Sequence, residues 1–212
     1  MIRCRAWLGC VVGGLVLVLL GILLDLDRGR PAASGRAVPI VNIGRVPPAQ
    51  HPPVQRHRHP SEAPRPLPDG SRLRIAGAAV DAAIRRVHLV GHELQVPHDP
   101  RLVGWWTGSA APGDRQGTVV IVGHVNYAGV TGALAVLPSL RPGEAVSIAE
   151  PRQAVRYRVA AVRTYPKTTG IPDSVFAQTG SPRLVLITCG GPFDSATGNY
   201  LDNIVAFARP SR

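Results

Sequence analysis

The sequence is poor in cysteine, lysine and acidic residues. Three cysteines among 212 residues are too few for a disulfide scaffold. Charged residues make up only 17% of the chain and aromatic residues 5%. Of the 24 basic residues, Lys167 is the single lysine and the others are arginines. Codon usage in a GC-rich genome explains this imbalance more simply than phosphate recognition by paired guanidinium nitrogens.

The formal net charge is +11, which raises nucleic acids or an anionic surface as partners. The charge divides into +2 for residues 1–24, +3 for residues 25–70 and +6 for residues 71–212. Nearly half of the excess therefore lies outside the largest part of the chain. No basic stripe with interleaved aromatic residues occurs, so we expect no nucleic-acid partner.

The amino-terminal segment 1–24 is predicted to be a transmembrane signal anchor. Residues 6–24 are 19 consecutive uncharged positions rich in Leu and Val. As a helix they would span about 28 Å, close to the thickness of a bilayer core. Arg3 and Arg5 precede them, which places the amino terminus in the cytoplasm and the remainder outside the cell. The alternative is a cleaved signal peptide, for which Ala32 and Ala33 offer only a weak site.

Residues 25–70 are predicted to form a disordered, proline-rich extracellular linker. The stretch has prolines every few residues and neither helical nor strand periodicity, which is typical of an extended spacer. Its histidines, His51, His57 and His59, could suggest a metal site. Prolines hold them apart and no acidic or thiol partner lies nearby, so we expect no metal there.

Residues 71–212 are predicted to form a single, mainly β catalytic domain. Short segments rich in Val and Ile alternate with Gly, Pro and Asp, and only residues 132–140 are typical of a short helix. Eight such strands with one or two short helices favour a closed or nearly closed β-barrel. The expected strands are 71–80, 85–91, 93–99, 117–125, 144–150, 154–165, 183–189 and 203–208.

Cys189 is the candidate nucleophile. It is the one cysteine outside the predicted membrane segment, and an unpaired extracellular thiol suggests reactivity. It ends the apolar run LVLIT and precedes Gly190 and Gly191, which places it at the end of a strand. The glycines permit tight turns and leave backbone N–H groups near the sulfur, as an oxyanion site requires. The alternative is a buried structural cysteine.

His124 is the candidate acid and base for this thiol, since a nucleophilic cysteine needs an imidazole beside it. It ends the apolar run TVVIVG just as Cys189 ends LVLIT. If these two strands are parallel neighbours, both side chains reach one end of the barrel. The competing histidines are His88, His92 and His98. The spacing HLVGH could suggest a zinc pair, but it suits a helix and the flanking sequence is strand-like, so we interpret these three as surface or edge residues.

The motifs GHVN, at His124, and LITC, at Cys189, resemble the sortases, and most closely the class F sortases of actinobacteria. The similarity covers about residues 72–209. It implies the eight-stranded sortase barrel, with Cys189 as nucleophile, His124 as acid and base, and no cofactor or metal. It also implies an enzyme of the cell membrane whose extracellular domain cleaves an LPxTG-type sorting signal. The acceptor amine would be a wall-precursor peptide or a pilin lysine, between which the sequence does not choose.

One position departs from the family pattern. Sortases generally place an arginine on the strand after the cysteine, but here that region reads GNYLDNIVAF, and the family position falls near Asp202 or Asn203. The first arginine after Cys189 is Arg209, at the end of the strand. We predict that Asn203 positions the substrate carbonyl or the oxyanion, because its amide is a neutral donor. The alternative is that Asn203 merely caps or turns the chain.

Two other functions fit parts of this pattern. A hydrolytic cysteine protease would use the same Cys189 and His124 but transfer the acyl group to water. An inactive cell-wall-binding module would hold anionic polymers on its basic surface and would tolerate the loss of the thiol.

Overall fold

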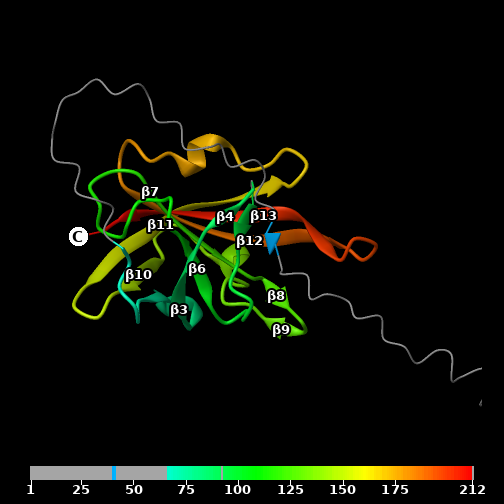
Figure 1. The fold of residues 1–212 in the computed structure, drawn as a ribbon, viewed down its shortest axis with the longest axis horizontal. Coiled ribbons are helices and arrows are strands. Elements are labelled where there is room, and N and C mark those ends of the chain that lie inside the picture. Colours follow the sequence, from blue (N-terminus) through cyan, green and yellow to red (C-terminus); the bar gives the residue numbers. More distant parts are fainter. Residues whose placement is uncertain (1–39, 42–65, 92, 212) are drawn as a thin grey trace, which may run out of the picture. The chain divides into compact units, whose positions relative to one another are not determined.

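The computed structural model describes residues 40–41, 66–91 and 93–211, which belong to one compact unit. The predicted membrane anchor and almost all of the predicted linker lie outside the described residues. Within the described ranges, no helix is long and apolar enough to cross a membrane. The described chain is dominated by strands (Figure 1).

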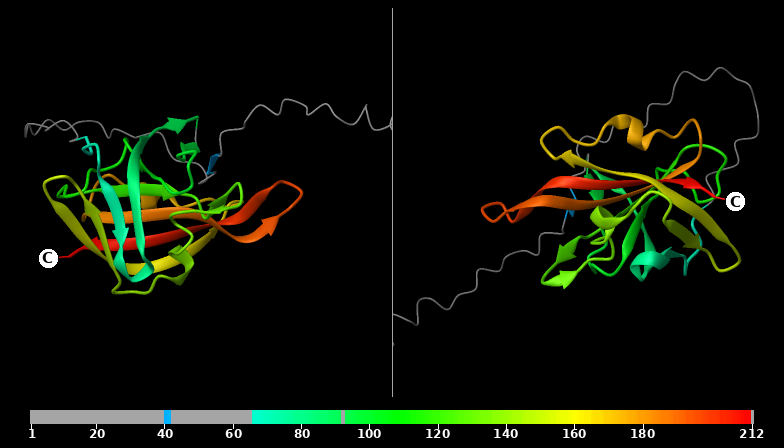
Figure 2. Two further views of the ribbon diagram at one scale, coloured as in Figure 1. Left: turned by 90° about the horizontal axis from the view of Figure 1, so that it is seen from below. Right: turned by 180° about the vertical axis from the view of Figure 1, so that it is seen from behind.

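Eight strands form a closed barrel, which confirms the mainly β, eight-stranded prediction. Around the barrel the order is β10-β11-β13-β12-β7-β6-β3-β2, and β2 pairs with β10 to close it. The hairpin of β12 and β13 extends beyond the rest of the barrel (Figures 1 and 2). The strands are β2 (Arg72–Ile75), β3 (Val80–Val87), β6 (Val103–Trp106), β7 (Thr118–Gly123), β10 (Ala145–Ala149), β11 (Ala154–Pro166), β12 (Arg183–Asp194) and β13 (Asn199–Pro210).

Smaller elements flank the barrel. A three-stranded sheet has the order β1-β5-β4, and β8 pairs with β9 in a short hairpin. Three 3₁₀ turns complete the described part of the chain. The bounds are β1 (Ile40–Val41), β4 (Leu89–Val90), β5 (Glu93–Gln95), β8 (Asn126–Tyr127), β9 (Val130–Thr131), η1 (Ala76–Ala78), η2 (Leu137–Ser139) and η3 (Asp173–Phe176).

The membership of the barrel differs from the prediction in two strands. The expected strand 93–99 contributes only β5, which lies outside the barrel. The barrel instead includes β6, whose sequence VGWW is too short to show an alternating pattern. Gly104 within β6 is required by packing, because a Cβ there would lie 2.6 Å from Val87 Cγ1. The expected helix 132–140 is only the 3₁₀ turn η2, which contains Pro138.

The two strands that contain the continuously apolar runs, β7 and β12, lie side by side in the barrel and are parallel, which meets the condition under which His124 and Cys189 reach one end of it. Their alternate residues belong to two different apolar clusters. Val119 and Leu184 pack in the cluster inside the barrel, whereas Val120 and Val185 pack in an outer cluster with Phe176 of η3. Because both faces are buried, neither strand needs polar residues at alternate positions.

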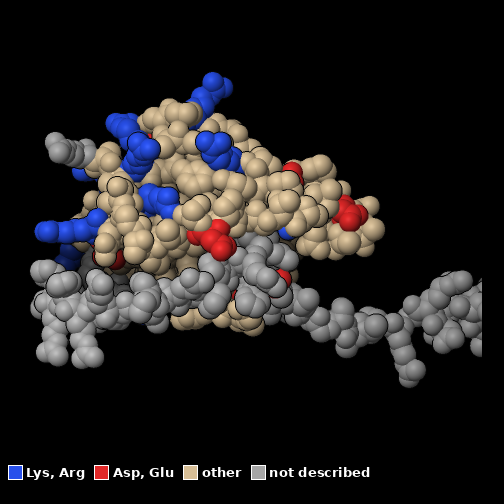
Figure 3. All heavy atoms as spheres, turned by 90° about the horizontal axis from the view of Figure 1, so that it is seen from above, with Lys and Arg blue, Asp and Glu red and all other residues tan. Residues whose placement is uncertain are grey.

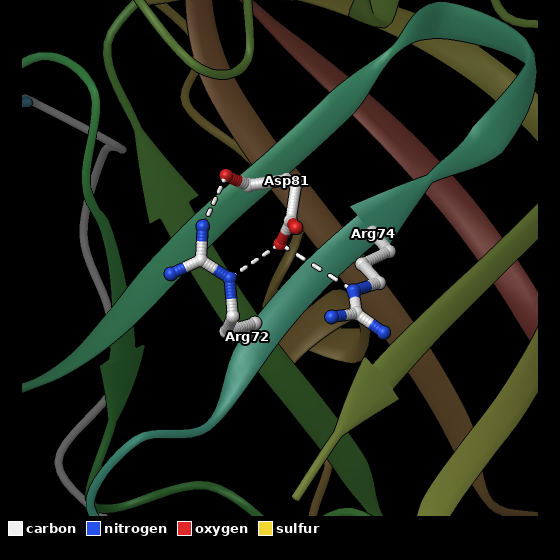
Figure 4. A network of polar contacts seen from close by, with 3 residues as sticks. All are labelled: Arg72, Arg74 and Asp81. Carbon is white, nitrogen blue, oxygen red and sulfur yellow. Dashed lines mark hydrogen bonds and ion pairs between the residues drawn. The ribbon is translucent and has the colours of Figure 1, made fainter.

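On the face drawn in Figure 3, basic side chains lie in separate places rather than in a single stripe. On the exposed side of the β2–β3 hairpin, Arg72 and Arg74 both contact Asp81 (Figure 4). The hydrogen bond from Arg72 is the main cause that lowers the pKa of Asp81. These exposed ion pairs join two strands of the barrel far along the chain from His124 and Cys189, and solvent screening keeps their contribution to stability small.

Candidate active site

His124 and Cys189 line one pocket, of about 330 Å³. In the parallel register of β7 and β12, Val122 lies opposite Ile187. His124 and Cys189 each follow two residues later, so both side chains reach the same end of the barrel. The walls come from the segment after β7 and from the β12–β13 hairpin. The lining residues are His124, Val125, Asn126, Tyr127, Ala128, Cys189, Phe193, Gly198, Asn199 and Tyr200.

His124 is buried and held in one orientation. Its Nε2 lies 3.0 Å from the carbonyl oxygen of Pro97, which can only accept a hydrogen bond. The proton of a neutral His124 ring therefore resides on Nε2, and Nδ1 is the nitrogen that can take up a proton. The ring stacks on Tyr127 with centroids 5.1 Å apart, and His98 contacts the same tyrosine edge-on.

The surroundings of His124 favour its neutral form. Burial lowers the pKa of this histidine below its ordinary value, and the nearby His98 lowers it further. The hydrogen bond to Pro97 acts in the opposite direction and offsets part of this effect. A neutral imidazole at neutral pH is ready to act as a base.

The backbone of His124 is fixed by the turn that follows it. Gly132 donates its N–H to the carbonyl of Val125 at 2.9 Å, and Leu134 donates to the carbonyl of His124 at 3.2 Å. A Cβ on Gly132 would lie 2.0 Å from the carbonyl oxygen of His124. Only glycine permits this approach, so Gly132 sets the position from which the imidazole projects.

Cys189 is half-buried on β12, on the face of the outer apolar cluster. Lys167 Nζ lies 3.5 Å from its Sγ. Burial raises the pKa of the Cys189 thiol above its ordinary value, while the charge and hydrogen bond of Lys167 lower it part of the way back. The thiol therefore lies between an ammonium group and the pocket that contains His124.

Two glycines after Cys189 lie in a β-bulge rather than in a turn. The pairing of β12 with β13 shifts its register between Gly190 and Phe193. A Cβ on Gly190 would lie 2.4 Å from Ile204 Cγ1, and one on Gly191 would lie 2.0 Å from Asp202 Oδ2. Gly191 also has a φ of 74°, which disfavours other residues. A bulge bends its strand and leaves a residue unpaired, and bulges are common next to active sites.

Asn203 lies directly opposite Cys189 on β13. It is also opposite Tyr165 on β11, and it is completely buried. It is not among the residues that line the pocket. Arg209 lies six residues farther along β13, about 20 Å away in an extended strand, and this distance excludes it from the site.

Of the other candidate histidines, the structure describes only His88 and His98. His88 Nδ1 lies 2.8 Å from Thr107 Oγ1 at an exposed position, whereas His98 contacts Tyr127 beside the pocket and lies near enough to His124 to lower its pKa. His92 and the linker histidines lie outside the described residues. Among the residues that the structure describes, no group of three His, Cys, Asp or Glu side chains could hold a metal ion.

Sequence reasoning missed three residues of the site. The first is Lys167, and the only feature of the sequence that could have drawn attention to it is that it is the single lysine of the chain. The other two are Asn126 and Tyr200, whose side chains form a hydrogen bond of 2.8 Å from Nδ2 to Oη. This bond joins the segment after His124 to the hairpin after Cys189, and so connects the two walls of the pocket.

Comparison with known proteins identifies the fold. A family model described as the Sortase domain matches residues 73–211. Sortase C-1 from Actinomyces oris is similar, with 20% identity and a TM-score of 0.52, over 67% of this chain and 73% of that protein. Sortase A from Corynebacterium diphtheriae is 18% identical over 69% of this chain and 62% of that protein, with a TM-score of 0.52.

A third similar structure is sortase C1 of Streptococcus agalactiae in complex with MTSET. It is 15% identical, with a TM-score of 0.53, and the match covers 67% of each chain. At these identities the structural likeness shows a shared fold. A search of curated proteins finds no match.

Proposed function

The chain belongs to the sortase family, and from this premise we propose that it is a class F-type cysteine transpeptidase that acts on an LPxTG-type sorting signal. The observation that carries the proposal is the placement of Cys189 and His124 in one pocket at the ends of two parallel strands. A thiol and an imidazole in a shared pocket are the two groups that acyl transfer through a thioester requires. No cofactor enters this chemistry.

In the acylation step, His124 Nδ1 takes the proton of the Cys189 thiol, and the thiolate attacks the Thr–Gly carbonyl carbon. The resulting oxyanion collapses as the protonated His124 gives its proton to the leaving glycine amine. A thioester then joins Cys189 to the substrate threonine. Asn203, directly opposite Cys189, positions the substrate carbonyl or the oxyanion in this proposal.

In the second step, an acceptor amine attacks the thioester, His124 removes its proton, and the thiolate of Cys189 leaves. The amine must lie on the His124 side of the sulfur in both steps, because His124 exchanges a proton with it. The pocket lies on that side, and its walls include Tyr127, Phe193 and Tyr200. We therefore assign it to the leaving and accepting amine, with a wall-precursor peptide or a pilin lysine as the acceptor.

The site would act outside the cell in this proposal. Residues 1–24 anchor the chain in the cell membrane, residues 25–70 form the extracellular linker and residues 71–212 form the catalytic domain. Protease added to cells without their wall should release the barrel by cutting the linker. Protection of the barrel until the membrane is permeabilised would contradict this topology.

The experiment that tests the reaction incubates the full chain with an LPxTG peptide and an amine acceptor, and identifies the products by mass spectrometry. A transpeptidase yields a new amide between the threonine and the acceptor. Hydrolysis product alone, unchanged by added acceptors, would indicate the protease instead. Binding of wall polymers with no cleavage by either route would indicate the wall-binding module.

A further inference from the structure

The only lysine of the chain lies beside the candidate nucleophile. Lys167 directly follows β11, and its backbone N–H donates to the carbonyl of Leu201 on β13, the neighbouring strand of the barrel, at 2.9 Å. After it, the N–H groups of Thr169 and Gly170 both donate to the carbonyl of Pro166. The backbone on both sides of Lys167 is therefore fixed by hydrogen bonds, and its side chain starts from a defined point.

The ammonium group is directed to the sulfur rather than to a carboxylate. Nζ of Lys167 lies 3.5 Å from Sγ of Cys189, and the contact is partly buried. Among the ion pairs of the described residues, none involves Lys167. Lysine side chains are usually exposed and strongly hydrated, so a half-buried lysine whose ammonium contacts a thiol is unusual for a residue with only a surface role.

The order of the strands places this cation opposite the imidazole. Along the sheet, β11, β13, β12 and β7 are neighbours. They bring Lys167, Asn203, Cys189 and His124 to one end of the barrel in that order. Lys167 does not line the pocket that contains His124. The sulfur thus has a permanent cation on one side and a proton acceptor on the other.

We propose that Lys167 is a catalytic residue, which stabilises the thiolate of Cys189 by a charge-assisted hydrogen bond. This inference rests on the proposed function for its consequence in catalysis. The proton of the thiol passes to His124, Lys167 keeps its own protons, and no other group changes charge. The same contact stabilises the thiolate when it leaves from the second tetrahedral intermediate. Lys167, directly after β11, thus supplies a cation that β13 does not offer beside Cys189, since Arg209 lies at its far end.

The test compares Lys167→Met, which keeps the length of the side chain without the charge, with Lys167→Arg, which keeps the charge. Arg163→Met is the matched control, because Arg163 is an exposed basic residue on β11, the strand that Lys167 directly follows. Lys167→Gln provides a second neutral variant should the Met variant fold poorly, and the melting temperature of each protein is measured. All proteins are full-length chains.

The first readout is the rate of alkylation of Cys189 by iodoacetamide between pH 6 and pH 10, followed on the Cys189 peptide by mass spectrometry. It needs no substrate, so it is independent of the proposed reaction. Other titratable side chains around the sulfur are His124, Tyr127 and Tyr200 in the pocket and Tyr165 in the outer apolar cluster. None of them is changed in these variants.

Loss of the ammonium should raise the pKa of the thiol. An opposite charge in contact with an acid lowers the pKa of that acid by about one pH unit or more. The alkylation rate at pH 7.5 should therefore fall about tenfold or more in Lys167→Met and Lys167→Gln. Lys167→Arg should recover most of the rate, and Arg163→Met should stay within about twofold of wild type. Coincident pH profiles for wild type and both folded neutral variants would overturn the inference.

The second readout is kcat/KM for the LPxTG peptide. It should fall by a factor of about 10² or more in the neutral variants, as it does when an enzyme loses one donor that stabilises a developing charge. If the wild type cleaves the peptide and the neutral variants match it, the inference fails while the proposed function stands. If no protein cleaves the peptide but alkylation still depends on Lys167, the proposed function fails while the contact with the thiolate stands.

Discussion

His124 and Cys189 each lie two residues beyond Val122 and Ile187, which are opposite each other in parallel strands. This equal offset brings the imidazole and the thiol into one pocket at the same end of the barrel. Antiparallel strands would have placed the two residues at opposite ends. The parallel pair is therefore the feature of the fold on which the proposed chemistry depends.

Replacement of His124 by Ala should slow acylation by a factor of roughly 10⁴, because the loss of any one member of a catalytic unit typically removes most of the rate enhancement. His88→Ala is the control, since His88 lies at an exposed position, where its Nδ1 is 2.8 Å from Thr107 Oγ1, and it does not line the pocket. It should stay within a few-fold of wild type in the same peptide-cleavage assay. An inactive His88→Ala with an active His124→Ala would refute the assignment of the base.

Gly132→Ala should impair catalysis through the backbone of His124. A Cβ at this position would lie 2.0 Å from the carbonyl oxygen of His124, so the segment must move. We expect a loss of about 1–3 kcal/mol in the free energy of unfolding, as for other overpacked sites. We also expect kcat/KM of the folded protein to fall, because the imidazole is displaced. Gly77→Ala, where a Cβ meets no atom within 4 Å, should change neither quantity. Wild-type cleavage by Gly132→Ala would show that the turn does not position the histidine.

The reactivity of Cys189 should keep rising with pH. Burial raises the pKa of the thiol, despite Lys167, and burial lowers the pKa of His124. Both changes favour neutral thiol and neutral imidazole over the thiolate–imidazolium pair. The thiolate fraction, and with it the alkylation rate, should therefore increase about tenfold per pH unit from pH 6 to pH 8. A plateau reached below pH 7 would reveal a stabilised ion pair and contradict this account.

Asn203→Ala should reduce acylation by about 10²–10³ if its amide positions the substrate carbonyl or the oxyanion. Asn203 faces Cys189 across β12 and β13 and is completely buried, so the melting temperature must be measured with the rate. A loss below roughly five-fold, or one explained by unfolding, would leave Asn203 with a packing role only.

The sequence predicted those parts of the molecule that local pattern determines. The runs before His124 and Cys189 are apolar without alternation, which is typical of strands buried on both faces. Their glycine-flanked ends indicated the two candidate site residues.

What the sequence did not predict depends on register between distant segments. Lys167 follows β11, and it reaches Cys189 only because β13 lies between β11 and β12. The hydrogen bond of Asn126 with Tyr200 joins residues 74 positions apart. The barrel strand β6 has only four residues and contains Gly104, so its pattern was too short to distinguish from a loop.

The most direct test of the central claim is the mass of the full chain after mixing with an LPxTG peptide and rapid acid quenching. The account predicts a covalent adduct on Cys189 whose mass corresponds to the peptide up to and including its threonine. Hydroxylamine should remove the adduct, as it cleaves a thioester. Cys189→Ala should show neither adduct nor cleavage. Cleavage of the peptide by Cys189→Ala, or an adduct located on another residue, would contradict nucleophilic catalysis by this thiol.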